Sequence, residues 1–175
     1  MKTKMITLLK NLPRILGVAI LFAGCVAQAG TLPAPQERIL LEVTGKITNT
    51  NAGNRAQFDL PMLEKLGISR RKTSTAWTEG QPVFEGVLMK DLFNQVGATG
   101  DKVTVVALND YKVDIPMSDF KNFPVILAYR MDGQALRVKD KGPLWIIYPA
   151  DEFPELNNKQ TQNKWVWQVK EIQIN

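Results

Sequence analysis

Apolar residues recur along the chain in short stretches, and several of these stretches have the alternation or the β-branched content of a strand. They lie at residues 38–47, 102–108, 111–115, 125–130 and 165–174, and residues 144–148 form a continuous apolar run between two prolines. Asn109-Asp110 separates two of the stretches and Asp132-Gly133 follows another, as hairpin turns do. The pattern predicts many short strands and two hairpin turns.

Three further segments have the start and stop signals of short helices. Residues 59–67 begin with an acidic cap and an early proline and end with glycine, residues 89–96 stop at a glycine, and a third helix is expected to begin at Ser118. The loop at residues 48–55 is rich in Asn, Thr and Gly and is expected to be exposed. Short strands interspersed with brief helices predict the α+β class.

The first 29 residues have the three parts of a secretory signal. Four basic residues are followed by an apolar run at residues 15–23, and Ala27-Gln28-Ala29 fits the small-x-small rule for cleavage before Gly30. The apolar run is shorter than the ~20 residues that a permanent membrane span requires. The sequence therefore predicts a periplasmic or secreted protein, with residues 30–175 forming a single domain that has no transmembrane span.

A competing cleavage site lies at Phe22-Ala23-Gly24-Cys25, which resembles a lipoprotein box. Cleavage there would leave Cys25 acylated at the new N-terminus. Phe22 stands where that box usually has leucine, so we favour cleavage after Ala29 and keep lipid anchoring at Cys25 as the minor alternative.

The chain has no histidine, and its single cysteine, Cys25, lies within the predicted signal. The predicted domain therefore has no disulfide, thiolate metal ligand or cysteine nucleophile. The lack of imidazole also excludes Ser-His triads, most zinc and copper sites, and haem with a histidine ligand.

The net positive charge of the chain comes from the predicted signal. The whole chain has 22 basic and 17 acidic residues, but Lys2, Lys4, Lys10 and Arg14 lie in the first 29 residues and no acidic residue does. The remaining domain is close to neutral and has one basic cluster, Arg70-Arg71-Lys72, of a size that usually marks a solvated loop. We expect no nucleic-acid partner.

Six motifs follow one another in an order that resembles the molybdopterin-binding domain of the sulfite oxidase family. Together they cover about residues 38–174. In chain order they are Phe58-Asp59-Leu60-Pro61-Met62-Leu63, Phe84-Glu85-Gly86-Val87-Leu88-Met89-Lys90-Asp91-Leu92, Asn109-Asp110-Tyr111, Leu127-Ala128-Tyr129-Arg130-Met131-Asp132-Gly133, Lys141-Gly142-Pro143-Leu144-Trp145 with Tyr148-Pro149, and Lys164-Trp165-Val166. No single motif is specific, and it is their order that makes the resemblance.

The resemblance implies a sulfite-oxidase-type fold, with mixed short-strand sheets around a barrel-like core, and a molybdopterin cofactor. In that family a cysteine thiolate, a soft charged ligand, binds molybdenum. Aligned on Ala76-Trp77, the place of that cysteine falls at Thr73, with Ser74 and Thr75 as alternatives. Trp145 stands where the family often has an arginine, and the chain has no histidine to hold the cofactor phosphate.

The candidate cofactor-binding residues each have a simpler structural interpretation beside the functional one. Trp145 is most simply a core aromatic, whereas Trp77, which follows the former ligand loop, is equally suited to line a pocket. The basic candidates usually face solvent, although they can hold an anion. Asp151 and its acidic neighbours lack the spacing of a cation site, so no metal ligand is predicted. The full set is Arg71, Thr73, Ser74, Trp77, Tyr111, Arg130, Lys141 and Trp145.

Three functions are consistent with these residues. The favoured one is a non-catalytic domain that binds a small ligand, or a periplasmic or membrane protein partner, in the former cofactor cleft, because the fold motifs persist without the metal ligand. The second is an active molybdopterin-dependent oxidoreductase that transfers an oxygen atom, with Thr73, Ser74 or no side chain on molybdenum. The third is an accessory subunit of a sensor or redox chain.

Overall fold

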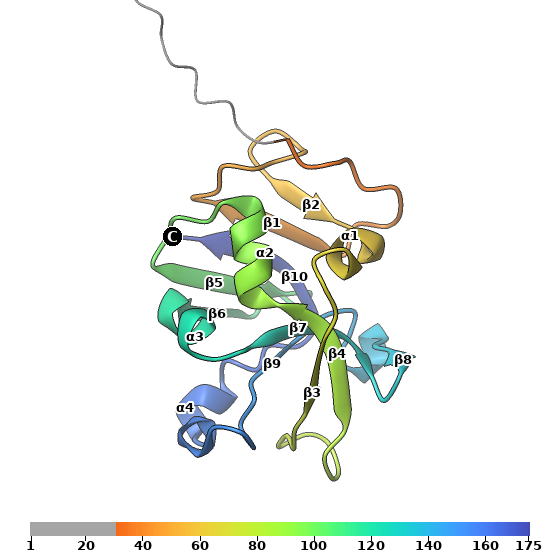
Figure 1. Cartoon of the computed structure of the whole chain (residues 1–175), viewed down its shortest axis with the longest axis vertical. Helices are drawn as coiled ribbons and strands as arrows, with labels where there is room; N and C mark the ends of the chain where they lie inside the picture. The colour runs from red at the N-terminus through yellow and green to blue at the C-terminus, as the bar shows by residue number, and fades with distance from the viewer. Residues whose placement is uncertain (1–30) are drawn as a thin grey trace, which may run out of the picture.

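Two open five-stranded sheets form the framework of the computed structural model, which describes residues 31–175 (Figure 1). The first sheet has the strand order β2-β1-β10-β5-β6. The last strand of the chain, β10, lies parallel to β1 and antiparallel to β5, so it joins the two ends of the domain. The strands of this sheet are β1 (Leu41–Gly45), β2 (Ala56–Phe58), β5 (Lys102–Ala107), β6 (Lys112–Pro116) and β10 (Val169–Ile174).

The second sheet has the strand order β3-β4-β7-β8, and β9 also pairs with β7. Strand β8 pairs with the end of β7 and strand β9 with its beginning. The strands are β3 (Ser69–Lys72), β4 (Val83–Leu88), β7 (Ile126–Met131), β8 (Gln134–Ala135) and β9 (Trp145–Ile147). The α+β class with mixed short-strand sheets is confirmed. The expected barrel-like core is wrong, because β2, β6 and β3 are edge strands and neither sheet closes.

Short helices pack around the sheets, and α2 crosses in front of the first sheet in Figure 1. Helix α2 has the predicted bounds, since its buried residues recur at helical spacing and Gly97 ends it with a φ of 62°. The α-helices are α1 (Leu60–Glu64), α2 (Met89–Val96), α3 (Met117–Asn122) and α4 (Lys159–Gln162), and two 3-10 turns lie at η1 (Val138–Asp140) and η2 (Pro154–Leu156).

The predicted acidic cap of the first helix is confirmed. One carboxylate oxygen of Asp59 accepts the N–H of Met62 at 2.9 Å, and the other accepts the N–H groups of Gln36 and Glu37 at 2.7 and 3.0 Å. Burial tends to raise the pKa of Asp59, but the backbone donors outweigh it and hold the pKa below its ordinary value. The cap therefore also fixes the leading segment of the domain.

The apolar run at residues 144–148 is explained by its position inside the molecule. Residues 144–149 are all buried, and so are residues 125–129 on the neighbouring strand β7. A strand buried on both faces reads as a continuous apolar run rather than an alternating one. These two strands place the centre of the second sheet within the core.

Several elements differ from the sequence prediction. Residues Ser69–Lys72 form strand β3, where the polar sequence predicts a solvated loop. Strands β2 and β4 and helix α4 are also present without being predicted. The strand expected at residues 165–174 is broken at Gln168, whose φ is 54°, so only its second half belongs to β10. The turn at Asp132-Gly133 is confirmed as a two-residue hairpin with positive φ at both positions.

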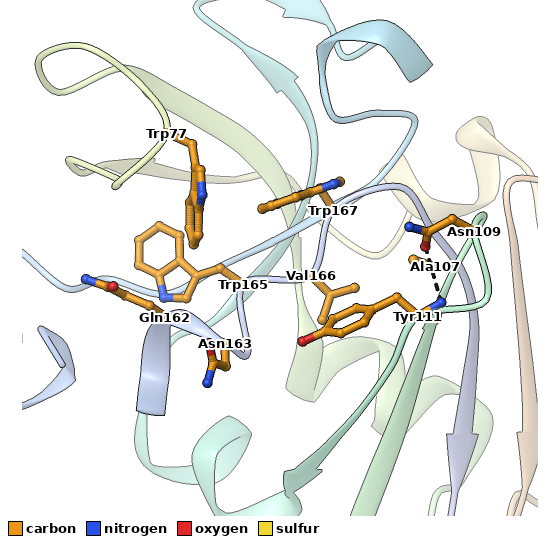
Figure 2. A pocket seen from close by; sticks show the side chains of 9 residues that line it. All are labelled: Trp77, Ala107, Asn109, Tyr111, Gln162, Asn163, Trp165, Val166 and Trp167. Atoms are coloured by element: carbon orange, nitrogen blue, oxygen red, sulfur yellow. Dashed lines mark hydrogen bonds between the residues drawn. The ribbon is translucent and has the colours of Figure 1, made fainter. Parts of the chain in front are cut away.

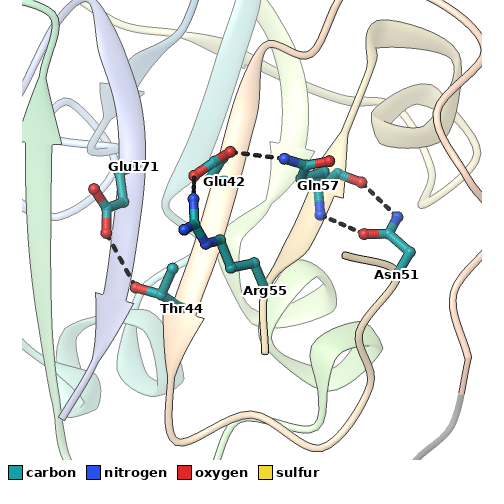
Figure 3. A network of polar contacts seen from close by, with 6 residues as sticks. All are labelled: Glu42, Thr44, Asn51, Arg55, Gln57 and Glu171. Carbon is teal, nitrogen blue, oxygen red and sulfur yellow. Dashed lines mark hydrogen bonds and ion pairs between the residues drawn. The ribbon is translucent and has the colours of Figure 1, made fainter. Parts of the chain in front are cut away.

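A polar network covers strands β2, β1 and β10 (Figure 3). Glu42 on β1 accepts hydrogen bonds from Arg55 at 3.3 Å and Gln57 at 2.7 Å, and Thr44 donates to Glu171 on β10 at 3.1 Å. Asn51 pairs with the backbone of Gln57 in both directions at 2.8 Å. The polar loop at residues 48–55 is thereby held against the edge of the first sheet.

Among residues 31–175, no helix is long and apolar enough to cross a membrane. The predicted secretory signal and the alternative lipidation site at Cys25 lie outside the described residues.

We expect Gly86→Ala to destabilise the fold by about 3 kcal/mol. A Cβ at this position would meet the Leu127 carbonyl oxygen and lie 2.6 Å from the Cα of Ala128, both on the paired strand β7. Urea unfolding measures the loss. Gly53→Ala is the control, because its Cβ meets nothing within 4 Å and only the positive φ of 64° opposes it, which costs roughly 1 kcal/mol. Equal losses in the two variants would contradict the steric argument.

Candidate functional site

Four indole rings cluster where the loop between β3 and β4, residues 73–82, meets the segment that leads into β10. The ring centroid of Trp77 in this loop lies 5.2 Å from that of Trp167, 6.2 Å from that of Trp165 and 6.3 Å from that of Trp145. Trp145 on β9 is fully buried and forms a β-bridge with Trp167. The aromatic contacts therefore hold the 73–82 loop against residues from both sheets.

An aromatic pocket of ≈ 250 Å³ opens beside this cluster (Figure 2). Its walls come from the 73–82 loop, from the hairpin that joins β5 to β6, and from residues 162–167 after α4. None of the residues that line it is charged. They are Trp77, Ala107, Asn109, Tyr111, Gln162, Asn163, Trp165, Val166 and Trp167.

A second pocket of ≈ 220 Å³ lies on the other side of Trp77, against the 73–82 loop. It shares Trp77, Gln162 and Trp165 with the aromatic pocket, so these three side chains separate the two spaces. Its remaining walls are Ser74, Thr75, Ala76, Ala150, Asp151, Leu156 and Asn157. We call this second space the loop pocket.

Asp151 ties down both ends of the 73–82 loop. Its carboxylate accepts the Ser74 hydroxyl and the Ser74 backbone N–H, both at 2.7 Å, and the side-chain N–H of Gln81 at 2.8 Å. The Ser74 hydroxyl, its backbone N–H and Gln81 together hold the pKa of Asp151 below its ordinary value. The loop pocket therefore has an ionised carboxylate at neutral pH.

The hydroxyl groups at the expected metal-ligand position have partners within the loop. Thr73 is buried, with 1% of its surface exposed, and its hydroxyl makes a long contact of 3.4 Å with the Ser74 carbonyl oxygen. The hydroxyls of Thr75 and Thr78 are hydrogen-bonded at 2.8 Å, and the Thr75 hydroxyl also accepts the backbone N–H of Trp77 at 3.0 Å. These contacts connect residues of the loop to one another.

The structure brings only some of the candidate residues to the two pockets. Ser74, Trp77 and Tyr111 line them, whereas Thr73, the first residue of the loop, and Trp145, in the core, are buried and line neither pocket. The three basic candidates line neither pocket. Arg71 donates to the Pro124 and Arg70 carbonyl oxygens, Arg130 pairs with Glu64 at 2.9 Å, and the Lys141 ammonium lies 5.6 Å from the Trp145 ring centroid.

The residues at the pockets do not fit a molybdopterin held by a thiolate. Among the residues that line the two pockets, Asp151 is the only charged one. A phosphate group there would be repelled by this carboxylate and would find no cation to pair with. Within the described residues, no group of three Cys, His, Asp or Glu side chains is arranged to hold a metal ion. A neutral hydroxyl at Thr73 or Ser74 is also a poor replacement for a soft thiolate.

Several pocket residues were missed by sequence reasoning. Asp151 contacts Ser74 across 77 positions of sequence, and no local pattern links the two. Gln162 and Asn163 belong to the unpredicted helix α4 and its end, and Trp167 was taken as part of a continuous strand. The proline-flanked acidic stretch around Asp151 was the only available signal, and its spacing pointed away from a metal site.

We expect Asp151→Asn to lower the free energy of unfolding by about 1 kcal/mol at pH 7, because it removes charge-assisted hydrogen bonds at an exposed site. The pKa of Asp151 is lower in the folded chain than the ~3.9 of an unfolded chain, so the stabilisation is complete above about pH 4 and is lost as the pH falls through the folded value. Urea unfolding at pH 7 and in acid measures both effects.

The matched control for this prediction is Glu152→Gln, which removes the exposed neighbouring charge. It should leave the free energy of unfolding within about 0.5 kcal/mol of the starting value. If Asp151→Asn behaved like this control at pH 7, or if its effect were as large in acid as at pH 7, the role given to Asp151 would be wrong.

Comparison with known proteins places this chain in a family. The family model of the oxidoreductase molybdopterin-binding domain matches residues 24–170. The crystal structure of the sulfane dehydrogenase SoxCD from Paracoccus pantotrophus is similar, with a TM-score of 0.57 and 19% sequence identity over 77% of this chain and 37% of that chain. This chain thus spans little over a third of that relative, and the likeness shows the fold alone. Comparison with curated proteins gives no match. The chain belongs to the oxidoreductase molybdopterin-binding domain family.

Proposed function

We propose that this chain is an exported, non-catalytic member of its family, which uses the former cofactor cleft to bind a small ligand or a protein partner. The observation that carries the proposal is the hydrogen bonding of Ser74 to Asp151, at 2.7 Å through both its hydroxyl and its backbone N–H. Ser74, an alternative to Thr73 for the position of the family's cysteine, is thus bonded to a carboxylate, which supports the proposal. The hydroxyls of Thr73 and Ser74 are uncharged and have hydrogen-bond partners within the chain.

The aromatic pocket favours a small ligand over a partner protein as the occupant. It is concave and has three indole rings in its walls, and ligand pockets are usually apolar spaces with a few polar groups. Trp77 lines it as expected, although Arg71 does not, so the pocket lacks the basic group that an anionic ligand needs. Because no basic residue lines the pocket, we expect its ligand to be neutral.

An active molybdopterin-dependent oxidoreductase is the second candidate, and family membership is the observation that favours it. The chain would have to use the hydroxyl of Thr73 or Ser74, or no side chain, as the protein ligand of the metal. Thr73 is buried, and the Ser74 hydroxyl donates a hydrogen bond to Asp151. The negative charge of Asp151 opposes ionisation of that hydroxyl. Both features disfavour a metal-bound alkoxide.

We expect the exported protein, purified from a host that makes the cofactor, to contain neither molybdenum nor pterin. Elemental analysis and pterin fluorescence are the measurements, with a thiolate-containing family member produced in the same host as the positive control. Thr73→Ala should leave both results unchanged. Molybdenum near one atom per chain would overturn the proposed function and establish the second candidate.

We also expect mass spectrometry of the exported chain to find an N-terminus at Gly30. The basic, apolar and small-x-small parts of residues 1–29 support this site. An acylated N-terminus at Cys25 would establish the lipoprotein alternative, and a chain that retains Met1 would contradict export.

A further inference from the structure

We propose that the aromatic pocket binds one uncharged ring that carries several hydroxyl groups, as a neutral monosaccharide does. The inference rests on the proposed function, because it requires the cleft to be free of a molybdenum cofactor. It is drawn from four properties of the pocket: its lack of charge, the angles between its rings, its free hydrogen-bonding groups and its size.

The pocket offers no ionic partner to a ligand. All of its lining residues are uncharged. Two charged residues beside them in sequence have ion-pair partners elsewhere in the chain, whereas the exposed Lys112, beside Tyr111, does not line the pocket. Asp110, beside Tyr111, accepts the Lys170 ammonium at 2.7 Å, and Lys164, beside Trp165, donates to Asp119 at 2.8 Å. A charged ligand would lose its hydration on entry and gain no counter-charge. A neutral ligand avoids this cost.

The aromatic walls meet at steep angles. The ring planes of Trp77 and Trp167 are inclined by 72°, and those of Trp77 and Trp165 by 53°. In Figure 2 the rings of Trp77 and Trp167 are seen nearly edge-on, whereas Trp165 turns its face to the viewer. A flat aromatic ligand packs best between parallel faces. A puckered ring instead presents C–H groups in several directions, and these groups carry the partial positive charge that an aromatic face attracts.

Free hydrogen-bonding groups lie on the same side of the pocket. The side chains of Gln162 and Asn163 make no hydrogen bond within the described residues, and each amide can both donate and accept. The indole N–H of Trp165 is buried and has no partner there, and Figure 2 shows it on the ring edge that faces Gln162 and Asn163. The Tyr111 hydroxyl points toward the same side.

The Trp165 indole N–H is unpartnered but has almost no accessible surface, so a ligand in the pocket would bond to the side-chain amides of Gln162 and Asn163. A hydroxyl group suits these amides, because it accepts from one amide N–H and donates to an amide oxygen at the same time. A quaternary ammonium ion would also be attracted to the aromatic faces, but it would leave the two amides without partners. The polar groups therefore favour a polyhydroxylated ligand.

The size of the pocket limits the ligand to one ring. Its volume of ≈ 250 Å³ lies below the ~300–1,000 Å³ that is typical of pockets for drug-sized ligands. A longer chain of rings would extend into solvent past the exposed residues Asn109 and Tyr111.

The test is titration calorimetry, with tryptophan fluorescence as a second signal because three of the lining residues are tryptophans. The neutral probes are D-glucose, D-galactose and N-acetyl-D-glucosamine, each added to about 50 mM so that an affinity of a few millimolar is detected. The charged and aromatic probes are D-glucuronate, D-glucosamine, choline and indole. We expect at least one neutral sugar to bind, and the other probes to bind at least about tenfold more weakly.

The variant Gln162→Ala tests whether the sugar binds in the aromatic pocket, which Gln162 lines. Its side chain makes no hydrogen bond within the described part of the chain, so the fold should persist while sugar affinity falls roughly five- to tenfold. The matched control is Gln173→Ala on β10, an exposed glutamine that lines neither pocket and should leave the affinity unchanged. Trp167→Ala should abolish the binding, provided that its circular dichroism spectrum is unchanged.

Three outcomes would overturn the inference: no binding of any neutral sugar, tighter binding of a charged or aromatic probe, or equal affinity in Gln162→Ala and Gln173→Ala. These failures differ from failure of the proposed function. If the chain contains no molybdenum and binds no sugar, the proposal of a non-catalytic binding domain still stands. If it contains one molybdenum atom per chain, the proposed function itself is wrong.

Discussion

The burial of Trp145 is the constraint on which the rest of this structure depends. Its ring is fully enclosed, packs against Phe84 at 5.3 Å between centroids, and donates its N–H to the Trp165 carbonyl oxygen at 3.2 Å. It thereby connects the second sheet to the segment that enters β10 of the first sheet. A buried indole needs close packing around its ring and a partner for its N–H. Phe84 provides packing and the Trp165 carbonyl oxygen provides the partner. The same packing fixes Trp167 and Trp165, which form the walls of the aromatic pocket.

This arrangement also explains why the basic residues are not at the site. Trp145 is fully buried and Lys141 lies over its indole ring. Arg130 is paired with Glu64, and Arg71 caps a backbone carbonyl. Each cation therefore has a structural partner outside the pockets. The cleft that remains is aromatic and neutral on one side of Trp77 and acidic on the other.

Much of the fold was predictable because its signals are local. The period of apolar residues and the terminal glycine defined α2, the Asp-Gly pair defined the β7–β8 hairpin, and Asp59 defined the first helix cap. Strand β3 escaped prediction because an edge strand with polar side chains on both faces has no apolar period, and the strand at residues 165–174 was overextended because positive φ at Gln168 leaves no mark on that period. The site was less predictable still, since the contact of Asp151 with Ser74 depends on tertiary structure alone.

The exchange of a thiolate for a hydroxyl changes more than the metal ligand. In this chain Asp151 restrains the loop through three hydrogen bonds, two of them to the residue next to the former ligand position. The same negative charge would repel an anion that entered the loop pocket. An anion bound beside Asp151 would favour protonation of its carboxylate, against the lowered pKa, or loss of its hydrogen bonds to the loop. The core requires neither change, because its packing is apolar and independent of the charge at the site. The family fold is therefore compatible with a cleft of different charge and chemistry.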